Sequence, residues 1–209
     1  MAAAWALAGA AAGFGVRRLS VWLARIEELE PGFERWQVWG PVAAGAVLFA
    51  VFGWRFGPTP LLLLKSLWVA VLVYVIFFDL EHRLILDRVM YPSMAAAVVA
   101  SILTPHPGWV NAIVTGVGAG AVFLLLALVG GVIFRAEVLG IGDVKLALFM
   151  GLILGFPWTL QALLLGILLA GVLSILLIAI RVKGLRDTIA YGPYLCAGTL
   201  IVLLERGAG

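Results

Sequence analysis

Apolar residues run through this chain in long blocks, separated by short stretches that hold most of the charged residues, prolines and glycines. An α-helix needs about 20 mostly apolar residues to cross a membrane, and charged or Pro/Gly-rich breaks mark where one such helix ends. The pattern predicts eight helices, over residues 2–16 with an extension to about 24, 38–54, 60–78, 89–103, 109–134, 144–156, 158–180 and 189–204. The first and the sixth are short for a membrane span.

The composition agrees with a membrane location. Of the 209 residues, 64% are hydrophobic and 12% are charged, whereas about 25% of the residues in soluble domains are charged. This composition excludes a cytosolic enzyme. We therefore expect an all-α polytopic membrane protein, a bundle of about eight transmembrane helices that forms a single transmembrane domain over residues 1–209. Within it, residues 1–57 hold the N-terminal helices and a short cytoplasmic loop, and residues 58–209 form the main bundle.

The lysines and arginines predict the orientation. One set of alternate connections between the expected helices holds 11 of these bases, and the opposite set holds Arg55 and Arg206. Because basic residues concentrate in cytoplasmic loops, the first set faces the cytoplasm and both termini lie outside. The remaining base, Lys65, falls inside an apolar block, where we expect its long side chain to reach the interface. The bases form no stripe with stacking aromatic residues, so we expect no nucleic-acid partner.

Two carboxylates lie where apolar blocks end, and ionisable residues at membrane depth mark functional sites. Asp79 ends the block over residues 60–78, and a negative charge at the C-terminal end of a helix opposes the helix macrodipole. Asp143 opens the block over residues 144–156, where it can simply cap a helix. Two preceding glycines, Gly140 and Gly142, favour a close backbone approach instead.

Two carboxylates on different helices at one membrane face are the minimum equipment for aspartyl hydrolysis. One takes a proton from water, and the other donates a proton to the scissile carbonyl. A pair that approaches closely shares a proton, because two adjacent charges repel. The distance along the chain between Asp79 and Asp143 leaves open whether they meet.

The segments around both acids form two motifs: residues 79–87 read Asp-Leu-Glu-His-Arg-Leu-Ile-Leu-Asp, and residues 140–145 read Gly-Ile-Gly-Asp-Val-Lys. These motifs resemble those of the type IV prepilin peptidases, which are polytopic aspartic proteases. The Gly-x-Gly-Asp string alone is weak evidence, whereas both segments in this order and on one membrane side are specific. Glu137 and the Tyr-Gly-Pro-Tyr run over residues 191–194 extend the likeness.

The resemblance implies a peptidase core over residues 58–209 that cleaves the leader from prepilins or pseudopilins at the cytoplasmic face of a bacterial or archaeal membrane. It implies that Asp79 and Asp143 are the catalytic pair and that no metal takes part. It also implies a substrate that carries a basic leader ahead of an apolar helix. Lys145 is expected either to position or tune Asp143 or to extend to the membrane interface, and Gly140 and Gly142 are expected to support Asp143. The remaining acids are expected either to contact the leader or to be solvated in loops: Glu81, Asp87 and Glu137.

Two departures from the family pattern affect these expectations. Leu86 stands where the family usually has proline, which predicts a looser turn after Asp79. The first cytoplasmic loop, residues 17–37, lacks the two Cys-x-x-Cys pairs of many family members, since Cys196 is the only cysteine. We therefore expect weak or absent methylation by S-adenosylmethionine, and no cofactor for peptide cleavage. The loop instead predicts an interfacial helix that guides the leader through acidic side chains: Glu27, Glu28, Glu30 and Glu34.

Other classes of membrane protein remain possible from the residues alone. A proton-coupled transporter also uses membrane carboxylates, but near the bilayer midplane. An intramembrane protease of the presenilin type places its acids within its spans, and a catalytically dead scaffold retains the same helices. His106, between two prolines, and Cys196, in an apolar stretch, have no assigned role.

Overall fold

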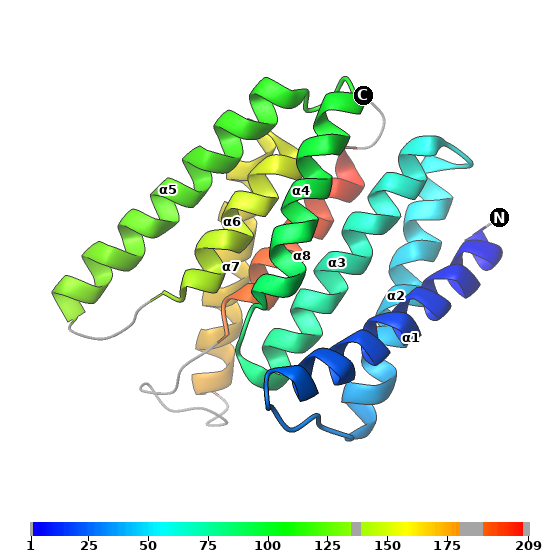
Figure 1. Ribbon diagram of the computed structural model, residues 1–209, viewed down its shortest axis with the longest axis horizontal. Helices are drawn as coiled ribbons and strands as arrows, with labels where there is room; N and C mark the ends of the chain where they lie inside the picture. The colour runs from blue at the N-terminus through cyan, green and yellow to red at the C-terminus, as the bar shows by residue number, and fades with distance from the viewer. Residues whose placement is uncertain (1, 135–138, 180–189, 207–209) are drawn as a thin grey trace. The chain divides into compact units, whose positions relative to one another are not determined.

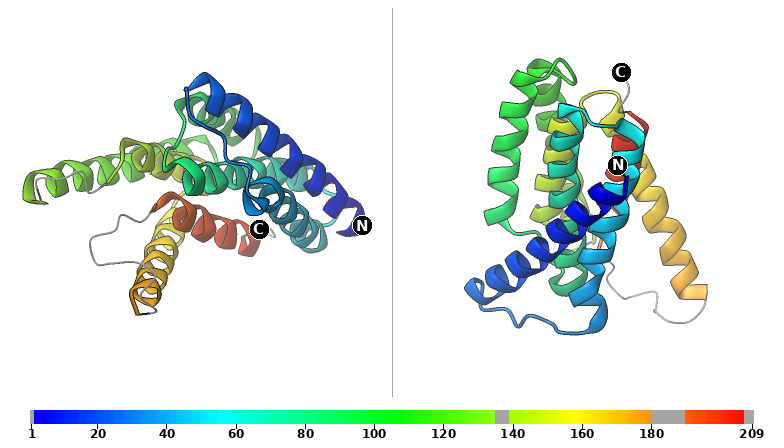
Figure 2. Two further views of the ribbon diagram at one scale, coloured as in Figure 1. Left: turned by 90° about the horizontal axis from the view of Figure 1, so that it is seen from below. Right: turned by 90° about the vertical axis from the view of Figure 1, so that its right-hand side faces the viewer.

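The computed structural model describes residues 2–134, 139–179 and 190–206. Every regular element in this part of the chain is an α-helix (Figures 1 and 2), which confirms the all-α class. The helices are α1 (Ala2–Ile26), α2 (Arg35–Phe56), α3 (Pro60–His82), α4 (Asp87–Leu103), α5 (Trp109–Phe134), α6 (Ile141–Leu154), α7 (Trp158–Ala179) and α8 (Gly192–Glu205).

Four described helices are long and apolar enough to cross a membrane, and they lie in α2, α3, α5 and α7. The helices α4, α6 and α8 have 17, 14 and 14 residues. A helix of 14 residues rises about 21 Å, less than the roughly 30 Å of a hydrocarbon core. The chain is thus a polytopic membrane protein, in which four of the helices that the structure describes meet the usual criteria for a membrane span.

The described chain forms two compact units, Met1–Leu84 with Leu203–Gly209, and Ile85–Val202. In the first unit, α1 lies across α2, and α3 lies beside α2 (Figure 1). Glycines allow the close approach of α1 and α2: a Cβ on Gly9 would overlap the backbone of Gly45, and a Cβ on Gly13 would overlap that of Pro41. Small residues at such positions let helix backbones pack closely in a membrane.

The first helix is longer than the pattern of bases suggested. The apolar pattern allowed an extension to about residue 24, whereas the bases favoured a cytoplasmic connection over residues 17–37; α1 continues to Ile26. The connection therefore covers only residues 27–34 and is not an interfacial helix. It ends at Glu34, which forms a capping box with Gln37 at the start of α2.

Lys65 also departs from its expected environment. Its side chain is buried, and its ammonium donates a hydrogen bond of 2.9 Å to the carbonyl of Leu203 in the last turn of α8. The same nitrogen lies 4.1 Å from the ring centroid of Phe56. A carbonyl at the end of a helix lacks a partner within the helix, so Lys65 satisfies one of these acceptors instead of reaching the interface.

The second unit is built on helix pairs that approach at glycines. A Cβ on Gly151 of α6 would overlap the backbone of Gly116 of α5, and a Cβ on Gly198 of α8 would overlap the carbonyl of Ala162 of α7. The helix α4 contacts both α5 and α6. The helix α6 ends at Gly155, whose φ of 66° is easily adopted only by glycine.

Candidate active site

Asp79 lies in the last turn of α3 and is 5% exposed. The helix ends at His82 because Arg83 adopts the left-handed conformation, with φ 53° and ψ 40°. In this conformation the backbone N–H of Arg83 donates a hydrogen bond of 2.8 Å to the carbonyl of Asp79. The backbone of Asp79 thus forms part of the C-terminal cap of α3.

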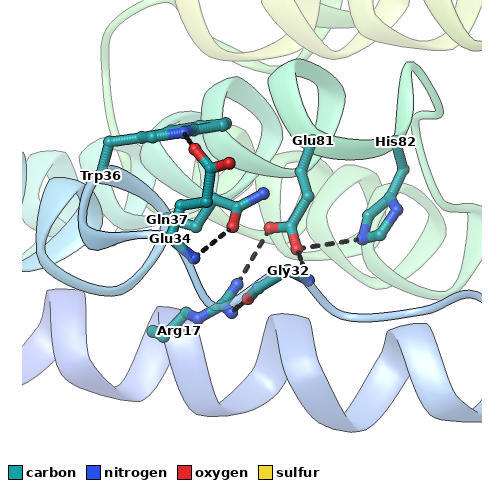
Figure 3. A network of polar contacts seen from close by, with 7 residues as sticks. All are labelled: Arg17, Gly32, Glu34, Trp36, Gln37, Glu81 and His82. Carbon is teal, nitrogen blue, oxygen red and sulfur yellow. Dashed lines mark hydrogen bonds and ion pairs between the residues drawn. The ribbon is translucent and has the colours of Figure 1, made fainter.

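Glu81, two residues after Asp79, accepts hydrogen bonds from two other elements (Figure 3). One carboxylate oxygen lies 2.9 Å from Nη1 of Arg17 on α1, and the other accepts from the backbone N–H of Gly32 in the connection between α1 and α2. Arg17 also donates to the carbonyl of Gly32. The side chains of Arg17 and Glu81 are 8% and 4% exposed. Removing one partner of such a buried pair costs about 3–5 kcal/mol, because the other charge stays buried.

His82 borders this network. Its Nε2 lies 3.6 Å from a carboxylate oxygen of Glu81 (Figure 3), and its ring centroid lies 4.6 Å from that of Phe78. Its side chain is 9% exposed. His82 is thus the last residue of α3, and its ring is largely buried.

Asp143 lies in the first turn of α6, one turn deeper in the helix than the sequence predicted. Gly140 is the N-cap residue, and the backbone N–H of Asp143 donates a hydrogen bond of 3.0 Å to its carbonyl. The Asp143 side chain turns back toward this residue, since a Cβ on Gly140 would lie 3.6 Å from Oδ2 of Asp143. The positive end of the helix dipole favours a carboxylate here, in contrast to Asp79.

Lys145, which we expected to position or tune Asp143, forms an ion pair with Asp87. Its ammonium donates to the carboxylate of Asp87 in the first turn of α4, and it lies 5.1 Å from the ring centroid of Tyr91. The side chains of Lys145 and Asp87 are 21% and 53% exposed. This ion pair links the N-terminal turns of α4 and α6, the second of which carries Asp143.

Leu86 lies in the turn between α3 and α4. It is the N-cap residue of α4, is 5% exposed, and has a φ of −75°, close to the −65° that a proline ring imposes. Its carbonyl accepts hydrogen bonds from the backbone N–H groups of Val89 and Met90. Leucine therefore holds a backbone conformation that proline also favours.

The remaining candidates contribute less to the geometry. Glu137 lies outside the described residues. His106 is exposed, and Cys196 is fully buried in α8. Among the described residues no group of three or more His, Cys, Asp or Glu side chains is arranged to hold a metal ion.

Sequence reasoning missed the role of Arg17, which it treated only as an orientation signal. The signal was present in the helical spacing, since Arg17 follows Gly9, Gly13 and Val16 on the buried face of α1 and precedes Ser20 and Leu23 on that face. An arginine at such a position needs a buried acceptor. The partner, Glu81, is far away in sequence and cannot be identified from that spacing.

The described helices make the chain a polytopic membrane protein, with Asp79 at the C-terminal end of α3 and Asp143 at the N-terminal end of α6. The sequence profile of the type IV leader peptidase family matches residues 66–175, which include Asp79 and Asp143. The chain belongs to the type IV leader peptidase family, which confirms the resemblance found in the sequence.

Three curated proteins are similar to this chain, each named prepilin leader peptidase/N-methyltransferase. The protein of Bacillus subtilis (strain 168) is 25% identical over 159 residues, covering 76% of this chain and 62% of that protein. The protein of Legionella pneumophila is 26% identical over 75% of this chain and 55% of its own length. That of Pseudomonas putida is 28% identical over 76% of this chain and 55% of its own length.

The chain thus aligns with little more than half of the length of these relatives. No solved structure matches it.

Proposed function

We propose that this protein is a membrane-embedded aspartic endopeptidase that removes the leader from type IV prepilins or pseudopilins. The observation that carries the proposal is the pair of acidic segments: the family match contains both, and each aspartate lies in the terminal turn of an apolar helix. A prepilin carries a basic leader ahead of an apolar helix, so its scissile bond would lie at a membrane interface. Carboxylates at helix ends are suited to that depth.

In the proposed reaction, one of the two carboxyl groups is ionised and the other is protonated. The carboxylate takes a proton from water while the oxygen of that water attacks the scissile carbonyl carbon, and the carboxylic acid donates its proton to the carbonyl oxygen. The tetrahedral intermediate collapses as its C–N bond breaks and a proton passes to the leaving nitrogen. This mechanism needs no cofactor. It requires Asp79 and Asp143 to approach each other, as in other carboxyl pairs that share a proton.

We place the reaction at the cytoplasmic face of a bacterial or archaeal membrane, with both termini of this chain outside. The distribution of lysines and arginines supports this orientation. The acidic residues of the connection over 27–34 lie on the side of the first unit where Gly32 contacts Glu81. They suit a basic leader.

The names of the relatives also include an N-methyltransferase activity. We propose that this chain methylates the new N-terminus weakly or not at all. The connection between α1 and α2 covers residues 27–34, and a segment well below about 40 residues does not fold around a cofactor on its own. S-adenosylmethionine would be needed only for this second reaction.

The test of the proposed function is direct. The purified protein in detergent is incubated with a synthetic prepilin peptide that carries its leader, and the products are identified by mass spectrometry. Release of the intact leader at one bond supports the peptidase. Absence of cleavage together with proton or ion uptake in proteoliposomes would favour a transporter instead.

A further inference from the structure

The buried network around Glu81 joins three parts of the first unit (Figure 3). Arg17 comes from α1, Gly32 from the connection between α1 and α2, and Glu81 from the last turn of α3. Each of the three donates to or accepts from both of the others. A closed triangle of hydrogen bonds with buried charges holds its members in one geometry, because no single bond can shift without breaking a second.

This network lies next to Asp79 along the same helix. Residues two apart on an α-helix point in different directions, so Glu81 faces α1 while Asp79 faces elsewhere. Fixing the carboxylate of Glu81 therefore fixes the rotation of the last turn of α3, and with it the direction of Asp79. The backbone N–H of Arg83 caps the carbonyl of Asp79 in this turn, and the bonds to Glu81 tie a side chain of the same turn to α1 and to the connection over residues 27–34.

The geometry also argues against a substrate contact at Glu81. Its side chain is 4% exposed, and both carboxylate oxygens already accept hydrogen bonds. A basic leader would have to displace Arg17 to reach it. Displacing that guanidinium would leave a buried positive charge without its partner.

We propose that Arg17 and Glu81 are positioning residues for the reaction, which hold Asp79 in its catalytic orientation by locking the end of α3 to α1 and to the connection over residues 27–34. This inference rests on the proposed peptidase function. It assigns to Arg17 a role beyond setting membrane orientation, and it replaces the expected leader contact at Glu81.

The first experiment is a double-mutant cycle in prepilin cleavage with Arg17→Met, Glu81→Gln and the double variant. Each single variant is expected to lower kcat at least tenfold, with KM within about twofold of wild type. The double variant is expected to have a kcat no lower than that of the less active single variant, because both changes break the same network. Arg18→Met is the matched control: it removes the same charge one residue away, but its side chain is exposed and lies over the ring of Phe14. Its kcat is expected within twofold of wild type.

A leader contact would give a different pattern. Glu81→Gln would then raise KM, whereas Arg17→Met would leave KM unchanged. With a substrate whose leader lysines and arginines are replaced by glutamine, Glu81→Gln and wild type would have the same KM. That result overturns the proposal, as does an additive double variant.

A second measurement does not depend on catalysis. Glutamyl endopeptidase cuts after glutamate, and the connection carries Glu27, Glu28, Glu30 and Glu34. Digestion within residues 27–34 is expected to be at least fivefold faster in Arg17→Met than in wild type, with Arg18→Met unchanged. Equal digestion rates in all three would overturn the network, whether or not the wild type cleaves prepilin, so this result is separable from failure of the proposed function.

If Arg17→Met does not fold, as judged by circular dichroism and gel filtration, Arg17→Lys replaces it in both experiments. Lysine keeps the charge, but its single ammonium lacks the planar fork that reaches both Glu81 and the carbonyl of Gly32. A smaller loss of kcat, about threefold to tenfold, and intermediate digestion are expected. If Arg17→Lys and Glu81→Gln each show the wild-type kcat and the wild-type digestion rate, the proposal is refuted.

Discussion

Gly142 packs against Ile85 so closely that a Cβ on Gly142 would lie 2.9 Å from the Cβ of Ile85. Ile85 belongs to the segment that follows Asp79, and Gly142 directly precedes Asp143. The contact holds the first turn of α6 against the segment that leads into α4. Together with the ion pair between Lys145 and Asp87, it joins residues 85–87 to the first turns of α6 within the second unit.

A methyl group at Gly142 should therefore impair the enzyme. Gly142→Ala is expected to cost about 1–3 kcal/mol of stability from overpacking and to lower prepilin cleavage at least tenfold, because the first turn of α6 must shift. Gly140→Ala is the control, since its Cβ would meet only Oδ2 of Asp143 at 3.6 Å and the nitrogen of Gly142 at 3.9 Å. Thermal unfolding by circular dichroism and initial cleavage rates measure both. Equal effects at the two glycines would contradict the packing argument.

Asp79 and Asp143 are each expected to be essential. Asp79→Asn and Asp143→Asn should abolish leader cleavage while the protein remains folded, because an amide can neither accept a proton from water nor donate one as a carboxylic acid does. Mass spectrometry of the peptide products and gel filtration of each variant provide the measurement. Near wild-type turnover by either variant would end the assignment of the pair.

The ion pair between Lys145 and Asp87 should matter less. Because Asp87 is 53% exposed, the pair is expected to contribute at most about 1 kcal/mol to stability. Lys145→Met and Asp87→Asn should each lower cleavage severalfold, and the double variant should resemble the single ones. Complete inactivity of Asp87→Asn alone would require a new choice of catalytic acids.

The orientation in the membrane can be tested with single cysteines in a Cys196→Ser background. Arg88→Cys, in the first turn of α4, is expected to react with impermeant thiol reagents only from the cytoplasmic side, and Arg55→Cys, in the last turn of α2, only from outside. Both positions are exposed. Labelling of intact cells compared with inverted vesicles reports the side, and the reverse pattern would invert the orientation.

Methyl transfer should be weak or absent in this chain alone. Cleaved pilin is incubated with the purified protein and labelled S-adenosylmethionine, and incorporation into the new N-terminus is counted. We expect less than about one tenth of the pilin to be methylated under conditions of complete cleavage. Stoichiometric transfer would show that the helices themselves provide a cofactor site.

The sequence determined the all-helical class, the eight helices and the family, because apolar blocks separated by polar breaks and two short motifs are local signals. It located Asp79 and Asp143 at helix ends for the same reason. Helix boundaries were less accurate: α6 was expected to begin at residue 144 and begins at Ile141, whereas α1 ends at Ile26, close to the extension to about residue 24 that the pattern allowed.

Tertiary structure alone decided which charged groups pair. Arg17 and Glu81 are 64 residues apart, and Lys145 and Asp87 are 58 residues apart. No local pattern specifies such partners. An arginine on a buried helix face requires an acceptor, but the sequence offers several acids and does not show which one lies near it. The fold brings Glu81 within 2.9 Å of Arg17 because α1 and α3 pack together in the first unit. Burial of both charges then makes any other pairing costly.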